Sequence, residues 1–200
     1  MVTRRGKTRE SILDASVDLF GTRGVAGVSL DEIAGVVGVA KQTVLYWFPS
    51  KDELLDAVLQ QTALELATLI EAAVRAAPDE PLARIEAVVR AVFRPAVRRP
   101  ALLGLVREVS RLSPPHAERL TLQVQPYVQR ATDYLQAQMD EGRLRRGDPA
   151  LMVALAYATV TGIATEAEAL RAVRWPATPA GLRRLRTELI EFVLAALRPT

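Results

Sequence analysis

Apolar side chains recur at helical spacing along most of the chain, and this pattern predicts an all-α protein. A first helix is expected at about residues 7–23. Its apolar stripe consists of Ile12, Ala15, Leu19 and Phe20. Later stripes lie within residues 82–96, 102–112, 120–135 and 182–197, and residues 151–164 are apolar nearly all round. No segment shows the alternating pattern of a half-buried strand, so the expected fold class is all-α.

Two short helices joined by a glycine turn are predicted between Ser29 and Pro49. Ser29 is followed three residues later by Glu32, which is the sequence of a helix-starting capping box. Gly38 follows the first helix, where a left-handed residue turns the chain at little steric cost. Two short helices with such a turn are typical of a helix-turn-helix motif. A plain αα-corner in an ordinary helical protein is the alternative.

The second of these helices is predicted to have one apolar and one polar face. The residues expected to face the interior are Val44, Leu45 and Phe48. The residues expected to contact DNA are Lys41, Gln42, Thr43 and Tyr46. Amides and cations match the hydrogen-bonding groups of base edges, and hydroxyls reach phosphate oxygens. Trp47 either joins them at the edge of the groove or packs inside.

Cations flank this motif on both sides. Arg4 and Arg5 belong to a basic arm that precedes the first acidic residue, and such an arm is expected to contact phosphates or the minor groove. A solvated, disordered tail is the alternative. A second capping box, Ser50 with Glu53, is expected after the motif. Lys51 in its first turn is predicted to contact phosphate together with the helix N-terminus, the alternative being a solvent-exposed lysine.

Three segments in the first quarter of the chain follow one another in a distinctive order: ILDASVDLFGTRGVAGVSLDEIA, GVAKQTVLYWF and PSKDELL. They resemble the N-terminal DNA-binding domain of TetR-family transcriptional regulators. That family usually has Ser or Thr where this chain has Ala40, and its frequent Tyr and His fall on Leu45 and Trp47, with Tyr46 shifted by one place. The resemblance implies a DNA-binding repressor whose C-terminal domain binds a small-molecule effector and dimerises.

The expected domain division follows from the length of the next helix. From Leu54 to Ala77 the helical pattern is unbroken, which is too long for the small domain alone, and Pro78 and Pro81 then mark a junction. We therefore expect a three-helix helix-turn-helix domain at residues 1–50, joined to a larger helical effector-binding and dimerisation domain at residues 51–200.

The last two predicted helices are candidates for a dimer interface. Their starts are marked by Asp148 before Pro149 and by Thr178 before Pro179. The first of them is apolar nearly all round from Leu151 onward, which indicates burial on more than one side. Pairing both helices with their copies would form a four-helix bundle in a homodimer, with a monomeric bundle as the alternative. A two-fold dimer predicts a palindromic DNA operator.

The effector site is predicted less directly. Phe93, Tyr127 and Tyr157 are large amphipathic side chains that could line a pocket, and Arg107 lies near the apolar segments. Core packing is the alternative for each aromatic residue. The apolar surroundings favour a small, lipophilic effector.

The sequence offers little material for catalysis or metal binding. The 200 residues include no cysteine and a single histidine, His116, which is expected at the surface. We therefore expect no catalytic residues, no metal and no cofactor, and a protein that is not an enzyme.

The expected location is the cytoplasm, without a membrane segment. The basic N-terminus is not followed by an apolar signal core. The longest uncharged run, residues 149–165, is shorter than a membrane-spanning helix requires. The rival to a DNA-binding regulator is a helical small-molecule binding or scaffold protein that does not act on DNA.

Overall fold

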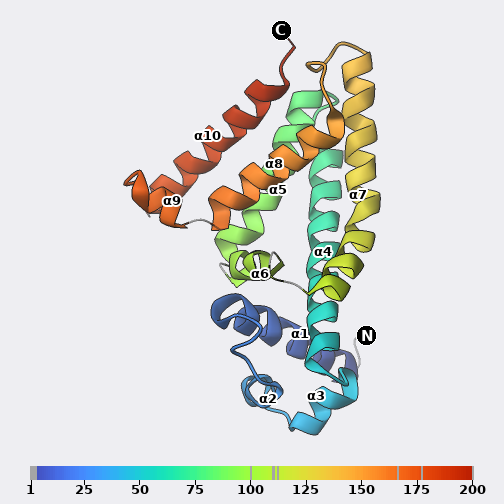
Figure 1. Ribbon diagram of the computed structural model, residues 1–200, viewed down its shortest axis with the longest axis vertical. Helices are drawn as coiled ribbons and strands as arrows, with labels where there is room; N and C mark the ends of the chain where they lie inside the picture. Colours follow the sequence, from blue (N-terminus) through green and yellow to red (C-terminus); the bar gives the residue numbers. More distant parts are fainter. Residues whose placement is uncertain are drawn as a thin grey trace. The chain divides into compact units, whose positions relative to one another are not determined.

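The computed structural model describes residues 4–99, 101–109, 111, 113–165, 167–176 and 178–199. Within these ranges the regular secondary structure is helical (Figure 1). The helices are α1 Arg4–Arg23, α2 Leu30–Val37, α3 Lys41–Trp47, α4 Lys51–Ala76, α5 Pro81–Arg98, α6 Ala101–Val109, α7 Pro114–Asp140, α8 Pro149–Thr165, α9 Ala167–Ala172 and α10 Pro179–Leu197. The expected all-α fold class is confirmed.

The chain forms two compact units that interleave in sequence. The first unit consists of Met1–Leu64 and Arg98–Gln123, and the second of Glu65–Val97 and Val124–Thr200. Helices α4 and α7 each begin in the first unit and end in the second. The first unit thus extends beyond the predicted domain of residues 1–50, because the start of α4 and helix α6 contribute side chains to its core.

The predicted signals around α2 are present in the structure. The Ser29 hydroxyl accepts a hydrogen bond from the Glu32 N–H (3.2 Å), and the Glu32 carboxylate accepts one from the Ser29 N–H (2.8 Å), which completes the capping box. Gly38 adopts the left-handed conformation with φ 76°. The sequence interpretation of this turn is therefore confirmed.

The core of the first unit joins residues from both of its segments. It contains Ile12, Leu13, Val17, Phe20, Val28, Ile33, Ala34, Val44, Phe48, Leu54, Leu55, Val58, Leu59 and Leu105. Val44 and Phe48 are buried as predicted, and Leu45 is half-buried. Leu105 of α6 lies 46 residues beyond Leu59, the last of the other members, so α6 completes a core that the N-terminal helices alone would leave open.

Helix α6 packs against α1 through backbone contact at two glycines. A Cβ atom added to Gly104 would lie 1.7 Å from the carbonyl oxygen of Gly21. A Cβ atom added to Gly21 would lie 1.9 Å from the carbonyl oxygen of Ala101. No side chain fits between the two helices at these positions, so the close approach requires glycine on both.

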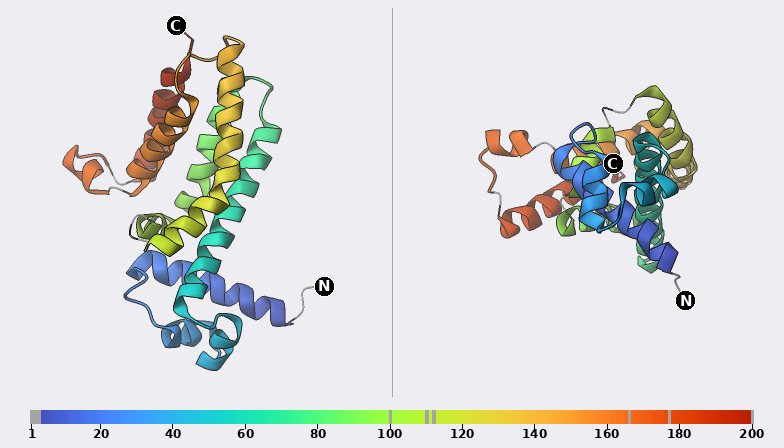
Figure 2. Two further views of the ribbon diagram at one scale, coloured as in Figure 1. Left: turned by 45° about the vertical axis from the view of Figure 1, so that its right-hand side comes forward. Right: turned by 90° about the horizontal axis from the view of Figure 1, so that it is seen from below.

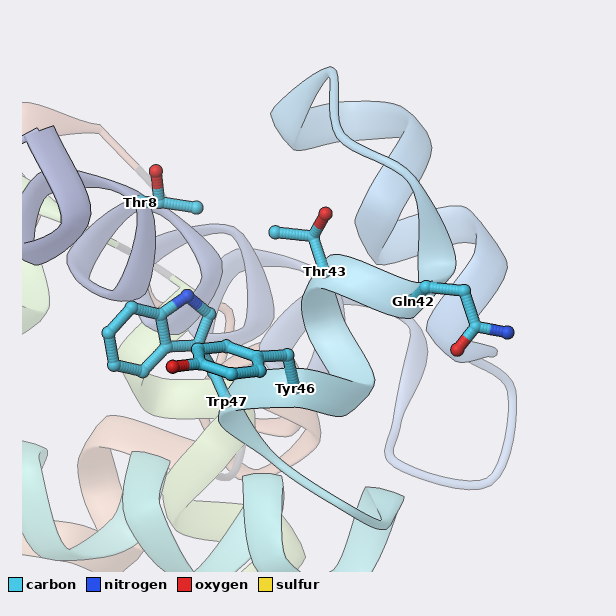
Figure 3. A pocket seen from close by; sticks show the side chains of 5 residues that line it. All are labelled: Thr8, Gln42, Thr43, Tyr46 and Trp47. Carbon is cyan, nitrogen blue, oxygen red and sulfur yellow. The ribbon is translucent and has the colours of Figure 1, made fainter.

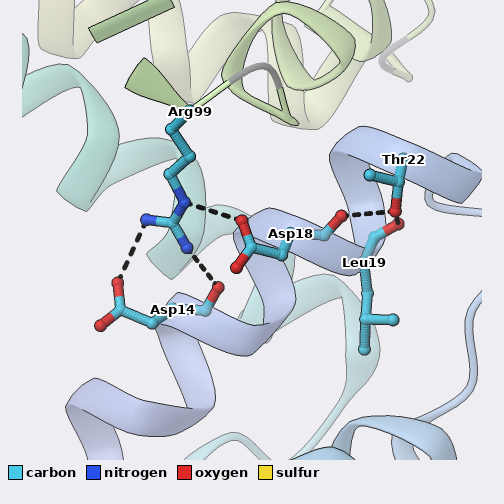
Figure 4. Close-up of polar contacts among 5 residues, drawn as sticks. All are labelled: Asp14, Asp18, Leu19, Thr22 and Arg99. Carbon is cyan, nitrogen blue, oxygen red and sulfur yellow. Dashed lines mark hydrogen bonds and ion pairs between the residues drawn. The ribbon is translucent and has the colours of Figure 1, made fainter.

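Polar contacts at both ends of α6 hold it against the N-terminal segment. Arg99, just before α6, donates from Nε to the Asp18 carboxylate (2.7 Å) and from Nη2 to the Asp14 carbonyl oxygen (2.6 Å), and Nη1 lies 3.3 Å from the Asp14 carboxylate (Figure 4). The hydrogen bond to Asp18 raises the pKa of Arg99. Near the other end, the half-buried Glu108 accepts a hydrogen bond from the Val25 N–H (3.0 Å).

The second unit has its own core, drawn from α5, α7, α8, α10 and the segment after α7. Its buried members are Val89, Phe93, Leu135, Met139, Leu144, Val160, Leu189, Ile190, Val193, Leu194 and Leu197. Helices α4 and α7 run side by side (Figures 1 and 2), and in this unit Arg130 pairs with Glu71 at 3.0 Å. Helix α7 continues through Pro126 without interruption.

Helix α4 is long and apolar enough to cross a membrane, judged by length and composition alone. Core helices of folded proteins can share both properties, and α4 supplies Leu54, Leu55 and Val58 to the core of the first unit. We therefore assign α4 to the packed protein.

Two expectations about local structure need correction. The backbone at Arg4 and Arg5 is helical, so α1 begins three residues before the predicted start at residue 7; the side chains of Arg4 and Arg5 lie outside the described part. The expectation that His116 is a surface residue is wrong, because its side chain is only 11% exposed and Nδ1 lies 2.6 Å from the Asp56 carboxylate. Burial against α4 and the acidic partner account for this position.

Candidate nucleic-acid interface

The turn between α2 and α3 fixes the direction in which α3 leaves the motif. Val39 donates its N–H to the Ala34 carbonyl oxygen (3.0 Å), and Gly38 donates to that of Gly35 (3.3 Å). At the start of α3, Ala40 makes no side-chain cap, and its carbonyl oxygen accepts from the Thr43 N–H (2.8 Å). The α3 N-terminus thus lacks the hydroxyl that a Ser or Thr would supply.

Helix α3 presents a polar face to solvent and buries the opposite face. Lys41 and Gln42 are exposed, and Tyr46 is 67% exposed. Thr43 is half-buried, whereas Val44 is fully buried. The burial pattern of α3 agrees with the two faces derived from the sequence.

An open hollow of about 370 Å³ lies on this face. Thr8 of α1 lines it together with Gln42, Thr43, Tyr46 and Trp47 of α3. Figure 3 shows the rings of Tyr46 and Trp47 close together, with the Gln42 side chain extending away from them. The structure thus brings four of the predicted DNA-contacting residues to one surface. Thr8 was not among the predicted residues, because the sequence pattern of the first helix indicates only which side is buried.

Trp47 packs partly inside the first unit and also lines the hollow on the outer face. It is half-buried and packs against the core of the first unit. Its ring also meets that of Tyr46 edge to face, with 5.3 Å between the ring centroids. The half-buried indole therefore restricts the position of the exposed Tyr46 ring through this contact.

Lys51 lies at the N-terminus of α4, as predicted. The Ser50 hydroxyl accepts a hydrogen bond from the Glu53 N–H (3.1 Å) and so caps the helix. Lys51 is half-buried in the first turn. A cation beside the free N–H groups of a helix N-terminus is suited to a phosphate oxygen.

Electrostatic contacts join the end of α1 to the start of α2. Arg23 Nη2 lies 2.7 Å from the Glu32 carboxylate and also donates to the Gly27 carbonyl oxygen (2.9 Å). The Ser29 backbone N–H first, and then Arg23, lower the pKa of Glu32 to about 2. Glu32 thus stays ionised well into the acid range, and its contact with Arg23 joins the end of α1 to the start of α2.

The four residues predicted to bind an effector occupy different environments. Phe93 is buried in the core of the second unit, and Tyr127 is half-buried with the Arg130 guanidinium 4.9 Å from its ring centroid. Tyr157 is largely exposed on α8, and Arg107 is exposed on α6 in the first unit. Of the three aromatic residues predicted to bind the effector, Phe93 alone is buried in the second unit.

The site is built for hydrogen bonding and charge contacts. Its groups are an amide, hydroxyls, an aromatic phenol and cations on α3 and the start of α4. Across the residues that the structure describes, no three histidine or acidic side chains are grouped so that they could hold a metal ion.

A short helix, a glycine turn and a second helix with a polar outer face define a helix-turn-helix protein. Residues 12–58 match the family model described as bacterial regulatory proteins, tetR family. Among curated proteins, the HTH-type transcriptional regulator RutR of Escherichia coli (strain K12) is 45% identical over 53 residues, which are 26% of this chain and 25% of RutR. The chain thus matches only about a quarter of the length of this relative. The similarity covers the N-terminal domain, where residues 12–58 resemble the DNA-binding domain of tetR-family regulators.

Solved structures show a similar fold over nearly the whole chain. The fatty acid degradation regulator FadR from Bacillus halodurans has a TM-score of 0.81 and 18% identity, covering 99% of this chain and 100% of that one. The regulator FadR from Bacillus subtilis, in complex with stearoyl-CoA, has a TM-score of 0.79 and 16% identity, covering 94% of this chain and 98% of that one. At these identities the likeness shows the fold.

Proposed function

We propose that this chain is a sequence-specific DNA-binding transcriptional regulator, and that it is a repressor released from a palindromic operator by a small, lipophilic effector. The observation that carries the proposal is the geometry of α3. Its inner face is fixed in the core through Val44 and Phe48, so its outer face is presented as a rigid unit. The match of residues 12–58 to the tetR family model supports the same function.

The proposed DNA contacts are of two kinds, to base edges and to the sugar-phosphate backbone. Gln42 and Lys41 would hydrogen-bond base edges, because amides and cations match their donors and acceptors. Thr43, Tyr46 and Trp47 would contact sugar and phosphate at the edge of the groove, and Lys51 a phosphate at the α4 N-terminus. The basic arm with Arg4 and Arg5 would add phosphate contacts beside them.

The proposed dimer uses α8 and α10. In the single chain, Leu151 and Leu155 on α8 and Phe192 on α10 are each more than half exposed. Large apolar side chains on both helices favour burial against a second copy, which supports a homodimeric four-helix bundle. A two-fold dimer would place its two α3 helices on two half-sites about 34–36 Å apart, or at a multiple of this spacing.

The proposed effector would bind in the second unit, with Phe93, Tyr127 and Tyr157 as candidate contacts and Arg107 as a candidate charged group. FadR from Bacillus subtilis was solved in complex with stearoyl-CoA, and its similar fold favours a lipophilic effector here. Effector binding would favour a dimer in which the spacing of the two α3 helices no longer matches the half-sites. The proposal includes no catalytic step and no cofactor, and it assigns the protein to the cytoplasm.

Selection of binding sites from random DNA duplexes tests the proposal. The expected result is an enriched palindromic or near-palindromic sequence, whereas asymmetric single sites or no enrichment would overturn it. Salt dependence separates it from the rival, a small-molecule binding or scaffold protein. Affinity for DNA should fall steeply with salt because phosphate binding releases counterions, whereas affinity for an apolar ligand should hardly change.

A further inference from the structure

The proposed DNA-binding face carries an ion pair within the helix-turn-helix motif. Lys41 Nζ lies 2.7 Å from the Asp31 carboxylate, and the two side chains are 46% and 64% exposed. Lys41 is the first residue of α3, and Asp31 lies in the first turn of α2. A cation proposed to reach DNA is therefore already bound by a carboxylate of the same motif when DNA is absent.

Helix electrostatics explain why the two residues pair. The N-terminus of a helix carries partial positive charge, so Lys41 stands at an unfavourable end of α3, and Ala40 supplies no side-chain acceptor there. Asp31 stands at the favourable end of α2. The Asp31 carboxylate thus offsets the positive charge of Lys41 from a helix position that already favours an acid.

We propose that Asp31 is a specificity-determining residue, which withholds Lys41 from DNA of random sequence and yields it only on the operator. This inference rests on the proposed DNA-binding function. On random DNA, a phosphate offers Lys41 an attraction of the same order as that of an exposed ion pair, and the Asp31 carboxylate is always within reach. Asp31 therefore retains the cation there.

The operator changes this competition because the neighbouring side chains are fixed first. Hydrogen bonds from Gln42 to the base edges of the operator hold α3 in the groove, so the DNA partner of Lys41 stands in place before the ion pair breaks. Non-specific affinity depends mainly on the number of phosphates that are neutralised. By withholding one cation from random DNA, Asp31 increases the ratio of specific to non-specific affinity.

The test measures affinity and its salt dependence by fluorescence anisotropy, with a random-sequence duplex and with the selected operator duplex. The variants are Asp31→Asn, Lys41→Gln and the double variant. Asp31→Asn should strengthen binding to the random duplex by about two- to five-fold, the range of an exposed ion pair. It should also steepen the salt slope on that duplex by about one unit. Operator affinity should change less.

The double variant decides whether Asp31 acts through Lys41. In the Lys41→Gln background, Asp31→Asn should leave the random-duplex affinity unchanged, because no cation remains to be released. Glu10→Gln, which removes an exposed acid from α1, is the control for net charge. If Asp31→Asn has the same effect in both backgrounds, the same effect as Glu10→Gln, or none, the inference is overturned while the proposed function stands.

Two further results complete the test. If the unaltered protein binds neither duplex in a salt-dependent manner, the proposed function fails and the inference fails with it. Thermal unfolding by circular dichroism checks that each variant is folded. If Asp31→Asn does not fold, Asp31→Ser takes its place, because serine also suits the first turn of a helix and carries no charge.

Discussion

Gly104 of α6 lies against Gly21 of α1 so closely that a Cβ atom on residue 104 would be 1.7 Å from the Gly21 carbonyl oxygen. We predict that Gly104→Ala forces the two helices apart and lowers the free energy of unfolding by about 1–3 kcal/mol, as overpacking does elsewhere. Gly35→Ala on α2 is the matched control, because its Cβ would meet nothing within 4 Å. It should leave stability unchanged or raise it by up to about 1 kcal/mol. Equal unfolding temperatures for both variants would contradict the close packing.

Arg99 should not be replaceable by lysine. The guanidinium reaches two carboxylates and a carbonyl oxygen on α1, which a single ammonium cannot match in geometry. Because the ion pairs of Arg99 with Asp14 and Asp18 are partly exposed, Arg99→Lys is expected to lower the free energy of unfolding by only about 0.5–1 kcal/mol. Hydrogen exchange followed by mass spectrometry should show faster exchange in the second half of α1. Arg90→Lys, which alters an exposed i,i+4 pair with Glu86, should leave α1 unchanged.

The acid stability of the first unit should depend on Glu32. Its pKa is lowered from 4.5 to about 2, so its contribution to stability is complete above pH 4.5 and is lost as the pH falls through about 2. Glu32→Gln should therefore unfold more readily than the unaltered protein at neutral pH, and the difference should shrink between pH 4.5 and pH 2. Denaturant unfolding at a series of pH values measures this. A difference that is constant with pH would argue against the ionised contact.

Lys51 and Gln42 should affect DNA binding in different ways. Replacing Lys51 by Ala should weaken binding to all sequences alike and reduce the salt slope by about one unit, because one phosphate contact is lost. Replacing Gln42 by Ala should instead change which bases are preferred, at a cost of about 1–3 kcal/mol on the operator. Repeating the duplex selection with each variant separates the two. An altered base preference in the Lys51 variant would reject its assignment to phosphate.

The proposed dimer should be sensitive to charge on α8. Leu155 is 56% exposed in the single chain, so Leu155→Glu should not disturb the fold, but it would place a carboxylate in the interface. We expect the molar mass from light scattering to fall to that of one chain. Leu122→Glu provides the control, since Leu122 is similarly exposed but belongs to α7 in the first unit. A dimer that survives Leu155→Glu would exclude this part of α8 from the interface.

The N-terminal motif could be predicted closely from sequence because its signals are local. Ser29 with Glu32 and the left-handed Gly38 act within a few residues, and the structure has both. The buried and exposed faces of α3 also follow from helical spacing alone. Such signals do not depend on how distant parts of the chain pack.

What the sequence did not reveal depends on contacts between distant segments. The place of α6 in the first core is one example, because nothing near Gly104 indicates that α1 lies against it. His116 was expected at the surface for the same reason, since its partner Asp56 is sixty residues away. The pairing of Lys41 with Asp31 could have been anticipated only by placing two helices side by side.

The interleaving of the two units limits how the DNA-binding first unit can be transferred between proteins. The chain passes between the units after Leu64, after Val97 and after Gln123. A chimaera that transplants only the first 64 residues would take α1 away from the Gly104 surface and from the guanidinium of Arg99, and leave α1 to meet an unrelated helix in the recipient. Changing the DNA target of another regulator with this unit therefore requires two grafts, because residues 98–123 must be transferred together with the N-terminal segment.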